Sequence, residues 1–216
     1  MKGLLLSGGI HHPFAETSVV VAGLLRGIGV GCDTHGVRDG LDRLAAERFD
    51  LLVVNALAFS MTQHEKYAPL RAEHAFAATE ADRAALCGHV ARGGGLLGLH
   101  TAAICFDGWD GWCDLLGAAW VWGASYHPPV VDLEVSGPDG TGTVRDELYC
   151  DLALARGATV VATATDGVEA QPVLVTHGRA SYLALGHDRA SVEAPAYAPL
   201  LRRAAAHALG REAAAA

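Results

Sequence analysis

Four histidines of this sequence stand beside glycine or proline at the boundaries of expected strands. His12, His100 and His187 each follow a short apolar run, and His127 lies just before Pro128, ahead of another run. An imidazole in such a place can bind a metal ion, act as a general base or hydrogen-bond a polar ligand. A single histidine beside a turn is more often an ordinary loop residue. The shared pattern predicts one common site, with all four histidines as candidate metal ligands.

The stretch 93–102 is the most informative of these surroundings. A glycine cluster leads into apolar residues that end at Gly98-Leu99-His100, which is typical of a buried parallel strand followed by a tight turn. In many α/β enzymes this turn presents a serine or cysteine nucleophile. Here it presents His100, so the sequence predicts the architecture of a nucleophile site with different chemistry. Cys105 lies beyond the turn and is expected to be a buried thiol.

Acidic and polar residues near these histidines complete the candidate site. Glu147 lies in the compact segment Asp146–Tyr149 and is a candidate general acid or base, together with His100 and His187. A carboxylate beside a histidine orients its ring and raises its basicity. Most acids are instead solvated surface groups, and this alternative stays open. The candidates for contacts with a substrate are Gly9, His11, Thr101, Tyr126 and Asp188.

Size and composition restrict the class of protein. The chain of 216 residues fits one domain with an ample core, which we expect over residues 1–210, with 211–216 as a frayed tail. A formal net charge of −8 argues against nucleic-acid binding, and the apolar runs are too short to cross a membrane. Five scattered cysteines without a Cys-x-x-Cys pair favour a reducing, cytoplasmic location. Assembly into a homo-oligomer stays open.

Short apolar runs alternate with helical patterns along most of the chain, which predicts an α/β fold with a mostly parallel, doubly wound sheet. Ligands of such sheets bind at the carboxyl ends of the strands, where His12 and His100 would meet. The expected strands are 4–7, 30–34, 49–55, 95–99, 130–135, 159–163, 172–176 and 180–185, and the expected helices are 17–27, 79–92 and 197–209. Residues 56–77 are expected to form a long loop with a helical piece.

Taken together, the motifs resemble the signature of the ThuA-like (trehalose utilisation) family. The matching segments are Gly-Gly-Gly-Leu-Leu-Gly-Leu-His-Thr-Ala at 93–102, Asp-Glu-Leu-Tyr at 146–149, Leu-Gly-His-Asp at 185–188, and the segments 7–14, 115–117, 127–128 and 172–173, which are modest one by one and fairly specific together. The resemblance covers almost the whole chain. It implies a flavodoxin-like sandwich related to class I glutamine amidotransferases. That superfamily has a cysteine where this chain has His100, so glutaminase chemistry is not expected.

The resemblance also implies a role in sugar metabolism, although fold analogy alone does not define the activity. We expect an enzyme that acts on a carbohydrate or keto-sugar by hydrolysis, elimination or isomerisation. We expect a divalent metal ion, with zinc as the first candidate, to bind two or three of the imidazoles and to keep one position open for water or a substrate oxygen. No nucleotide cofactor is expected, because no complete phosphate-binding glycine motif follows Gly9.

Two alternatives stay open at this point. The chain could be a non-catalytic sugar-binding or regulatory domain, or a hydrolase that uses Cys105, which would need an exposed, electropositive thiol. The aromatic residues between 106 and 126 are expected to be mostly core. One or two tryptophans at the mouth of a pocket would suit stacking against a sugar ring.

Overall fold

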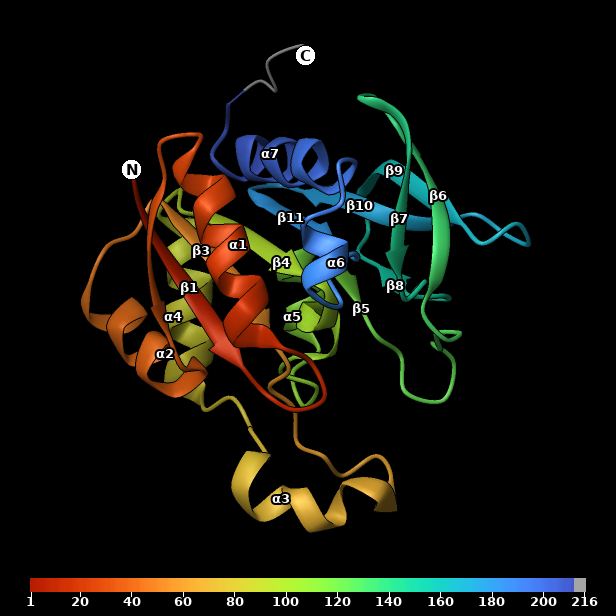
Figure 1. Cartoon of the computed structure of the whole chain (residues 1–216). Helices are drawn as coiled ribbons and strands as arrows, with labels where there is room; N and C mark the ends of the chain where they lie inside the picture. The colour runs from red at the N-terminus through yellow and green to blue at the C-terminus, as the bar shows by residue number, and fades with distance from the viewer. Residues whose placement is uncertain (212–216) are drawn as a thin grey trace.

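The computed structural model describes residues 1–211 and shows a large twisted sheet between layers of helices (Figure 1). The strands of this sheet are β1 (Lys2–Gly8), β2 (Gly31–His35), β3 (Leu51–Ala56), β4 (Gly95–Leu99), β6 (Val131–Gly137), β7 (Gly140–Asp146), β9 (Thr159–Thr165), β10 (Gln171–His177) and β11 (Ala180–Leu183). Their order is β2-β1-β3-β4-β11-β10-β9-β6-β7. A separate pair joins β5 (Ala118–Ala119) to β8 (Ala153–Leu154).

The helices cover both faces of the sheet. They are α1 (Phe14–Arg26), α2 (Val37–Ala46), α3 (Ala68–His74), α4 (Glu80–Ala91), α5 (Gly111–Leu116), α6 (Arg189–Val192) and α7 (Tyr197–Ala208), with short 3₁₀ turns η1 (Glu65–Tyr67) and η2 (His100–Ile104). In Figure 1, α1 lies in front of the sheet and packs on β1 and β2, whereas α4 lies behind it and packs on α2. None of the described helices is long and apolar enough to cross a bilayer.

One half of the sheet is parallel. β1 pairs with β2 and β3, β3 pairs with β4, and β4 pairs with β11, all in the parallel sense. β3 and β4 are buried along their whole length, because helices cover both of their faces. Glycine is required within β4, since a Cβ at Gly98 would come within 2.7 Å of the Leu116 side chain. The α/β, flavodoxin-like fold expected from the sequence is confirmed.

The other half is antiparallel. β10 turns back beside β11, and β9, β6 and β7 follow in antiparallel pairs. The expected hairpin around Gly178 is present, although its second strand ends at Leu183 rather than at residue 185. Along β6, the buried Leu133 and Val135 alternate with exposed residues, as in a sheet with one solvated face.

The segment between β3 and α4 leaves the body of the molecule and carries η1 and α3 (Figure 1). This confirms the expected long loop with a helical piece. We call residues 57–76 the lobe. Its apolar side chains Phe59, Met61 and Tyr67 form a small cluster with Ile10 and Phe14, which follow β1. The lobe is therefore anchored beside the carboxyl ends of the parallel strands.

The frayed tail expected over 211–216 falls almost entirely outside the described residues, which end at Arg211. Up to this residue the chain continues from α7 without a break, and the Arg211 guanidinium contacts the Met1 sulfur.

Candidate metal centre

Three histidines meet at the carboxyl edge of the parallel half. His12 follows β1, His100 follows β4 and His187 follows β11, and these parallel strands all end at the same edge. The Nε2 atoms of His12 and His100 are 3.2 Å apart. The rings of His12 and His187 stand edge to face, with 4.8 Å between their centroids. The strand ends thus gather three imidazoles into one group.

A carboxylate completes this group from the other half of the sheet. Glu147 follows β7, and its Oε2 atom lies 3.4 Å from His100 Nε2, 3.4 Å from His187 Nδ1 and 3.9 Å from His12 Nε2. One ligand atom from each of the four residues lies within 4.8 Å of every other. We call His12, His100, Glu147 and His187 the cluster.

The turn after β4 fixes the direction of the His100 ring. His100 has a φ of 43°, a left-handed conformation that costs a non-glycine residue roughly 1–3 kcal/mol. The Tyr182 hydroxyl donates a hydrogen bond to the backbone carbonyl of His100. The Nδ1 atom of His100 donates to the carbonyl of Ala184 at 2.7 Å. Because Nδ1 carries the proton, the lone pair of Nε2 faces the cluster. The turn resembles a nucleophile elbow that presents an imidazole.

The other two histidines also direct a nitrogen at the cluster. His12 Nδ1 lies 3.3 Å from the carbonyl of Ile10, an arrangement that leaves Nε2 as the free acceptor. His187 Nδ1 is buried and has no hydrogen-bond partner of good geometry in the described chain. A buried nitrogen without a partner is costly unless something binds it. This nitrogen faces Glu147 Oε2 at 3.4 Å without forming a well-aligned hydrogen bond, so its lone pair or proton points into the cluster.

The charges of the cluster are coupled. Burial acts to raise the pKa of Glu147, but the close approach of His100, His12 and His187 outweighs it and holds the pKa far below its usual range. Burial lowers the pKa of His12 by more than the nearby Glu147 carboxylate raises it. The nearby Glu147 carboxylate is the main reason that the pKa of His187 is raised. Glu147 is thus anionic and His12 is neutral at neutral pH.

The second buried carboxylate, Asp146, holds the cluster in place. Asp146 is fully buried and accepts hydrogen bonds from the backbone N–H groups of Glu147 and Gly186, both at 2.7 Å. The His187 N–H approaches it at 3.4 Å, and the Ser191 hydroxyl also donates to it. One side chain therefore ties the segment of Glu147 to the segment of His187. Sequence analysis singled out Asp146–Tyr149 but gave a role only to Glu147.

A family model described as "Trehalose utilisation" (ThuA) matches residues 7–208. The chain belongs to the ThuA family. A ThuA-like protein of Parabacteroides merdae has a solved structure of TM-score 0.70 to this chain, at 17% identity, covering 100% of this chain and 92% of the other.

A second ThuA-like structure, from Bacteroides uniformis, gives a TM-score of 0.67 at 16% identity and covers 96% of this chain and 91% of the other. At such identities the two structures establish the shared fold. No curated protein matches the ThuA chain in sequence.

His127 takes a different place in this ThuA chain from the other three histidines. Its Nδ1 lies 3.4 Å from Oε1 of Glu147, the oxygen that faces away from the cluster nitrogens. Its side chain is 40% exposed, and it is not a member of the cluster. A ligand role for His127 stays a prediction. The position fits a group that exchanges protons between Glu147 and solvent.

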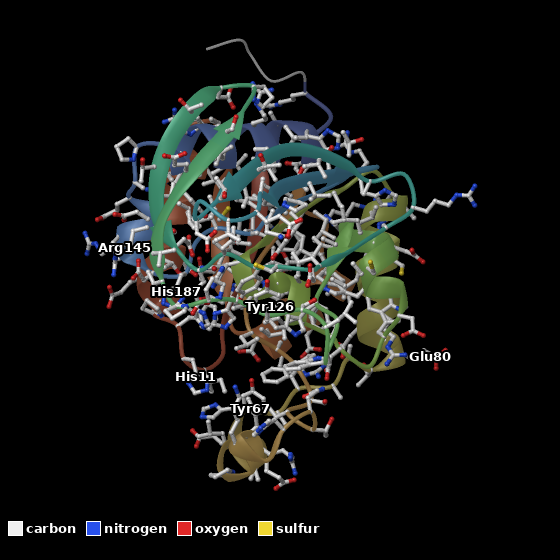
Figure 2. The ribbon with its side chains drawn as sticks, turned by 90° about the vertical axis from the view of Figure 1, so that its right-hand side faces the viewer. His11, Tyr67, Glu80, Tyr126, Arg145 and His187 are labelled. Atoms are coloured by element: carbon white, nitrogen blue, oxygen red, sulfur yellow. The ribbon has the colours of Figure 1, made fainter. Side chains whose placement is uncertain are left out.

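The candidate substrate-binding residues are spread around this edge. Figure 2 shows Tyr126 and His187 on the same side of the molecule, and Tyr126 is 55% exposed. Figure 2 also places the exposed His11 on the loop above the lobe that carries Tyr67. Gly9 has a φ of 132°, and a Cβ there would lie 2.7 Å from the carbonyl of Leu57. Contacts of these residues with a substrate stay predictions.

Two further candidates already have structural contacts. The buried hydroxyl of Thr101 donates to the carbonyl of Ala56 at 2.7 Å, which fastens the turn to β3. The Asp188 side chain accepts from the N–H of Ser191 and caps the start of α6. These contacts explain both residues without a ligand, and a second role in binding a substrate stays a prediction.

Tyr149 and Tyr182 are neighbours of the cluster to which sequence analysis gave no role. The Tyr149 hydroxyl lies 3.4 Å from His100 Nε2, and its ring packs on the His100 ring at 4.6 Å. Burial raises the pKa of both tyrosines well above the usual value, so both stay neutral. Only their position in space, which no local pattern reveals, links them to His100.

The thiol near the turn does not belong to the site. Cys105 is buried, its Sγ donates to the carbonyl of Ala56, and burial raises the pKa of the thiol to about 12. A thiol of this kind is not a nucleophile at neutral pH. The expected buried thiol is present, and the geometry gives no support to a hydrolase that uses Cys105.

Proposed function

We propose that this ThuA chain is a metal-dependent enzyme of carbohydrate metabolism and that the cluster binds zinc. The observation that carries the proposal is the convergence of three imidazole nitrogens and one carboxylate oxygen within 4.8 Å of one another. Zinc binds such atoms at about 2.0–2.1 Å in a tetrahedron, so neighbouring ligand atoms should be about 3.3 Å apart. Four of the six distances between these atoms, 3.2, 3.4, 3.4 and 3.9 Å, are close to that value, and all six are within 4.8 Å.

The type of ligand also favours zinc. Imidazole nitrogen suits zinc and other transition metals, whereas magnesium and calcium prefer all-oxygen sites. In zinc proteins the second ring nitrogen of a ligand histidine usually donates to a carbonyl or carboxylate. His100 and His12 have this arrangement, with the carbonyls of Ala184 and Ile10 as partners.

The residues around the cluster suit acid–base chemistry on a sugar. A zinc ion held by the cluster could take a fifth ligand and would then polarise a carbonyl or hydroxyl oxygen of the substrate. Glu147 would take or return the substrate proton through Oε1, the oxygen that does not face the cluster, and His127 beside this oxygen would exchange that proton with solvent. Hydrolysis, elimination and isomerisation all need such a transfer. The family description, trehalose utilisation, supports a small carbohydrate as the substrate.

The proposal includes a cytoplasmic location. All five cysteines lie within the described residues and are unpaired, as is usual in a reducing compartment.

The direct test is zinc binding combined with turnover. Metal-free protein is titrated with zinc in competition with a chelating dye, and His187→Ala and Glu147→Gln are compared with His74→Ala, which changes a histidine of the lobe. We expect one zinc per chain in the parent and in His74→Ala, and at least about 100-fold weaker binding in the other two, a loss larger than outer-shell changes cause. Equal binding by all four proteins would refute the metal site.

Turnover of trehalose and of 3-keto-glucosides decides between an enzyme and a binding domain. We expect turnover that disappears with a chelator and returns with zinc. Sugar binding without turnover of any of these compounds would instead favour the non-catalytic alternative.

A further inference from the structure

A hollow of about 240 Å³ borders the far end of the turn η2, which begins with His100. It is formed by the turn η2, the start of α5 and residues 119–122, and its side chains are largely aromatic or aliphatic. The residues that matter here are Ile104, Asp107, Trp109, Asp110, Trp120 and Trp122. Pockets for drug-sized ligands measure roughly 300–1,000 Å³, so this smaller hollow suits a single ring.

Trp120 connects the hollow with the cluster. Its ring lines the hollow and also packs edge to face on Tyr149, at 5.1 Å between centroids. Tyr149 in turn packs on His100, and Trp120 lies 6.1 Å from His127. Trp120 therefore borders both the hollow and the partly exposed His127, whose Nδ1 lies 3.4 Å from Glu147.

The charged groups of the lining are two carboxylates, Asp107 and the exposed Asp110, and the rest is largely apolar. The Asp107 carboxylate already accepts hydrogen bonds from the backbone and hydroxyl of Ser60. A sugar hydroxyl buried against Ile104 and the indole rings would lack a partner, at a cost of about 1–3 kcal/mol. An aromatic ring has no such cost, and it gains from edge-to-face or offset contacts with the tryptophans.

One donor remains for the atom that joins the ring to the rest of a ligand. The indole Nε1 of Trp120 is buried and has no hydrogen-bond partner in the described part of the chain. An oxygen between a sugar and an aromatic ring is an acceptor of the kind this N–H needs.

Building on the proposed function, we propose that the hollow binds the aromatic aglycone of a glycoside. The sugar ring lies at the cluster and the aromatic ring lies between Trp120 and Trp109. This assigns a substrate class, aryl glycosides, and gives Trp120 the role of a specificity-determining residue.

The test compares ligands that differ only in the aglycone. Phenyl glucosides and methyl glucosides of both anomers are titrated calorimetrically against the zinc-loaded full-length chain, with phenol and the disaccharides trehalose and cellobiose as further probes. We expect a phenyl glucoside to bind at least tenfold more tightly than the methyl glucoside of the same anomer. Phenol should compete with it.

Two variants locate the preference. Trp120→Ala and Trp109→Ala should each abolish the difference between the phenyl and methyl ligands while leaving the methyl glucoside affinity within about threefold, since a lost contact acts only on the group it touched. Val160→Ala, an exposed apolar position of β9 outside the hollow, should keep the difference. A cooperative urea-unfolding transition, which does not depend on zinc, shows that each variant is folded.

Several outcomes would overturn the inference. These are equal affinity for phenyl and methyl glucosides, no binding of either, tighter binding of a disaccharide than of the phenyl ligand, or a preference that survives Trp120→Ala. The zinc titration is read separately. Loss of the metal site with a persistent phenyl preference would refute the proposed function and leave the aromatic subsite standing.

Discussion

The two halves of the sheet deliver their ligands to the cluster in different ways. In the parallel half, His100 follows β4 directly, and a single left-handed residue turns its ring into place. In the antiparallel half, Glu147 follows β7, which is the edge strand of the sheet. The chain after β7 therefore has to approach the end of β11 for Glu147 to reach the histidines. Asp146 makes this approach possible by binding the backbone of both segments. Strand ends position the histidines, whereas a buried side chain positions the carboxylate.

The largest expected effect is loss of a ligand from the parallel half. We expect His100→Ala to weaken zinc binding by more than about 100-fold, because the metal loses a directly bonded nitrogen and outer-shell losses alone reach that size. Competition with a chelating dye measures it, with His74→Ala as the control. Zinc binding equal to that of the control would show that the turn does not present a ligand.

The next effect concerns the support from the antiparallel half. Asp146→Asn keeps the shape of the side chain but replaces one carboxylate oxygen with an NH2 group, which cannot accept the backbone N–H bonds. We expect about 10–100-fold weaker zinc binding, because the segments of Glu147 and His187 are then held less firmly. The free energy of unfolding of the metal-free protein should fall by about 3–5 kcal/mol, as when a buried charge network is broken. Asp132→Asn, on the exposed face of β6, is the matched control. Equal zinc affinity in both variants would leave Asp146 a purely structural role.

The two oxygens of Glu147 provide a finer comparison. His127→Ala removes the partner of Oε1 and no member of the cluster, so zinc affinity should stay within about threefold while turnover falls by about 10²-fold or more. Zinc binding and steady-state turnover are measured on the same preparation. A loss of zinc as large as in His100→Ala would make His127 a ligand.

Thiol reactivity tests whether the turn has kept any nucleophile chemistry. Iodoacetamide at neutral pH should modify the exposed Cys87 in the folded protein, but not Cys105, whose pKa is raised to about 12 by burial. Mass spectrometry of digests locates the label, and unfolded protein should react at every cysteine. Rapid labelling of Cys105 with loss of turnover would reopen the cysteine hydrolase.

The smallest effect concerns the parallel half away from the cluster. Asp82 forms a capping box with Thr79 at the start of α4 and pairs with Arg38. Burial opposes ionisation, yet these bonds lower the pKa of Asp82. Its contribution is therefore present above its unfolded pKa and is lost as the pH falls through the folded pKa. Asp82→Asn should cost about 1–2 kcal/mol at pH 7 in urea unfolding, and the difference should shrink in acid.

Zinc affinity should not change in Asp82→Asn. A difference in unfolding free energy that grows in acid would contradict the sign of this pKa shift.

The contrast between the halves also explains what the sequence could predict. Continuous apolar runs in the sequence indicated the strands β3 and β4. Because ligands bind at the carboxyl ends of parallel strands, His12 and His100 were expected to lie close together. The helix at 79–92 was recognisable from the capping residue Thr79, which the structure confirms. β7 was missed, because Gly-Thr-Gly-Thr-Val-Arg-Asp has a single large apolar residue. α2 was missed because its buried face is small: it consists of Gly40, Leu41 and Leu44.

The role of Asp146 could not be predicted, because its partners Gly186 and Ser191 are distant in sequence and meet it only in the folded chain. The same holds for Trp120, whose place between the hollow and Tyr149 depends on long-range packing. Local patterns show which residues end a strand. They do not show which buried side chain fastens one loop to another.

Anomalous diffraction from crystals of the protein soaked in zinc tests the central claim most directly. We expect one strong peak per chain within bonding distance of His12 Nε2, His100 Nε2, His187 Nδ1 and Glu147 Oε2. No peak among these four atoms, while zinc binds elsewhere on the chain, would contradict the assignment of this edge of the sheet as a metal centre.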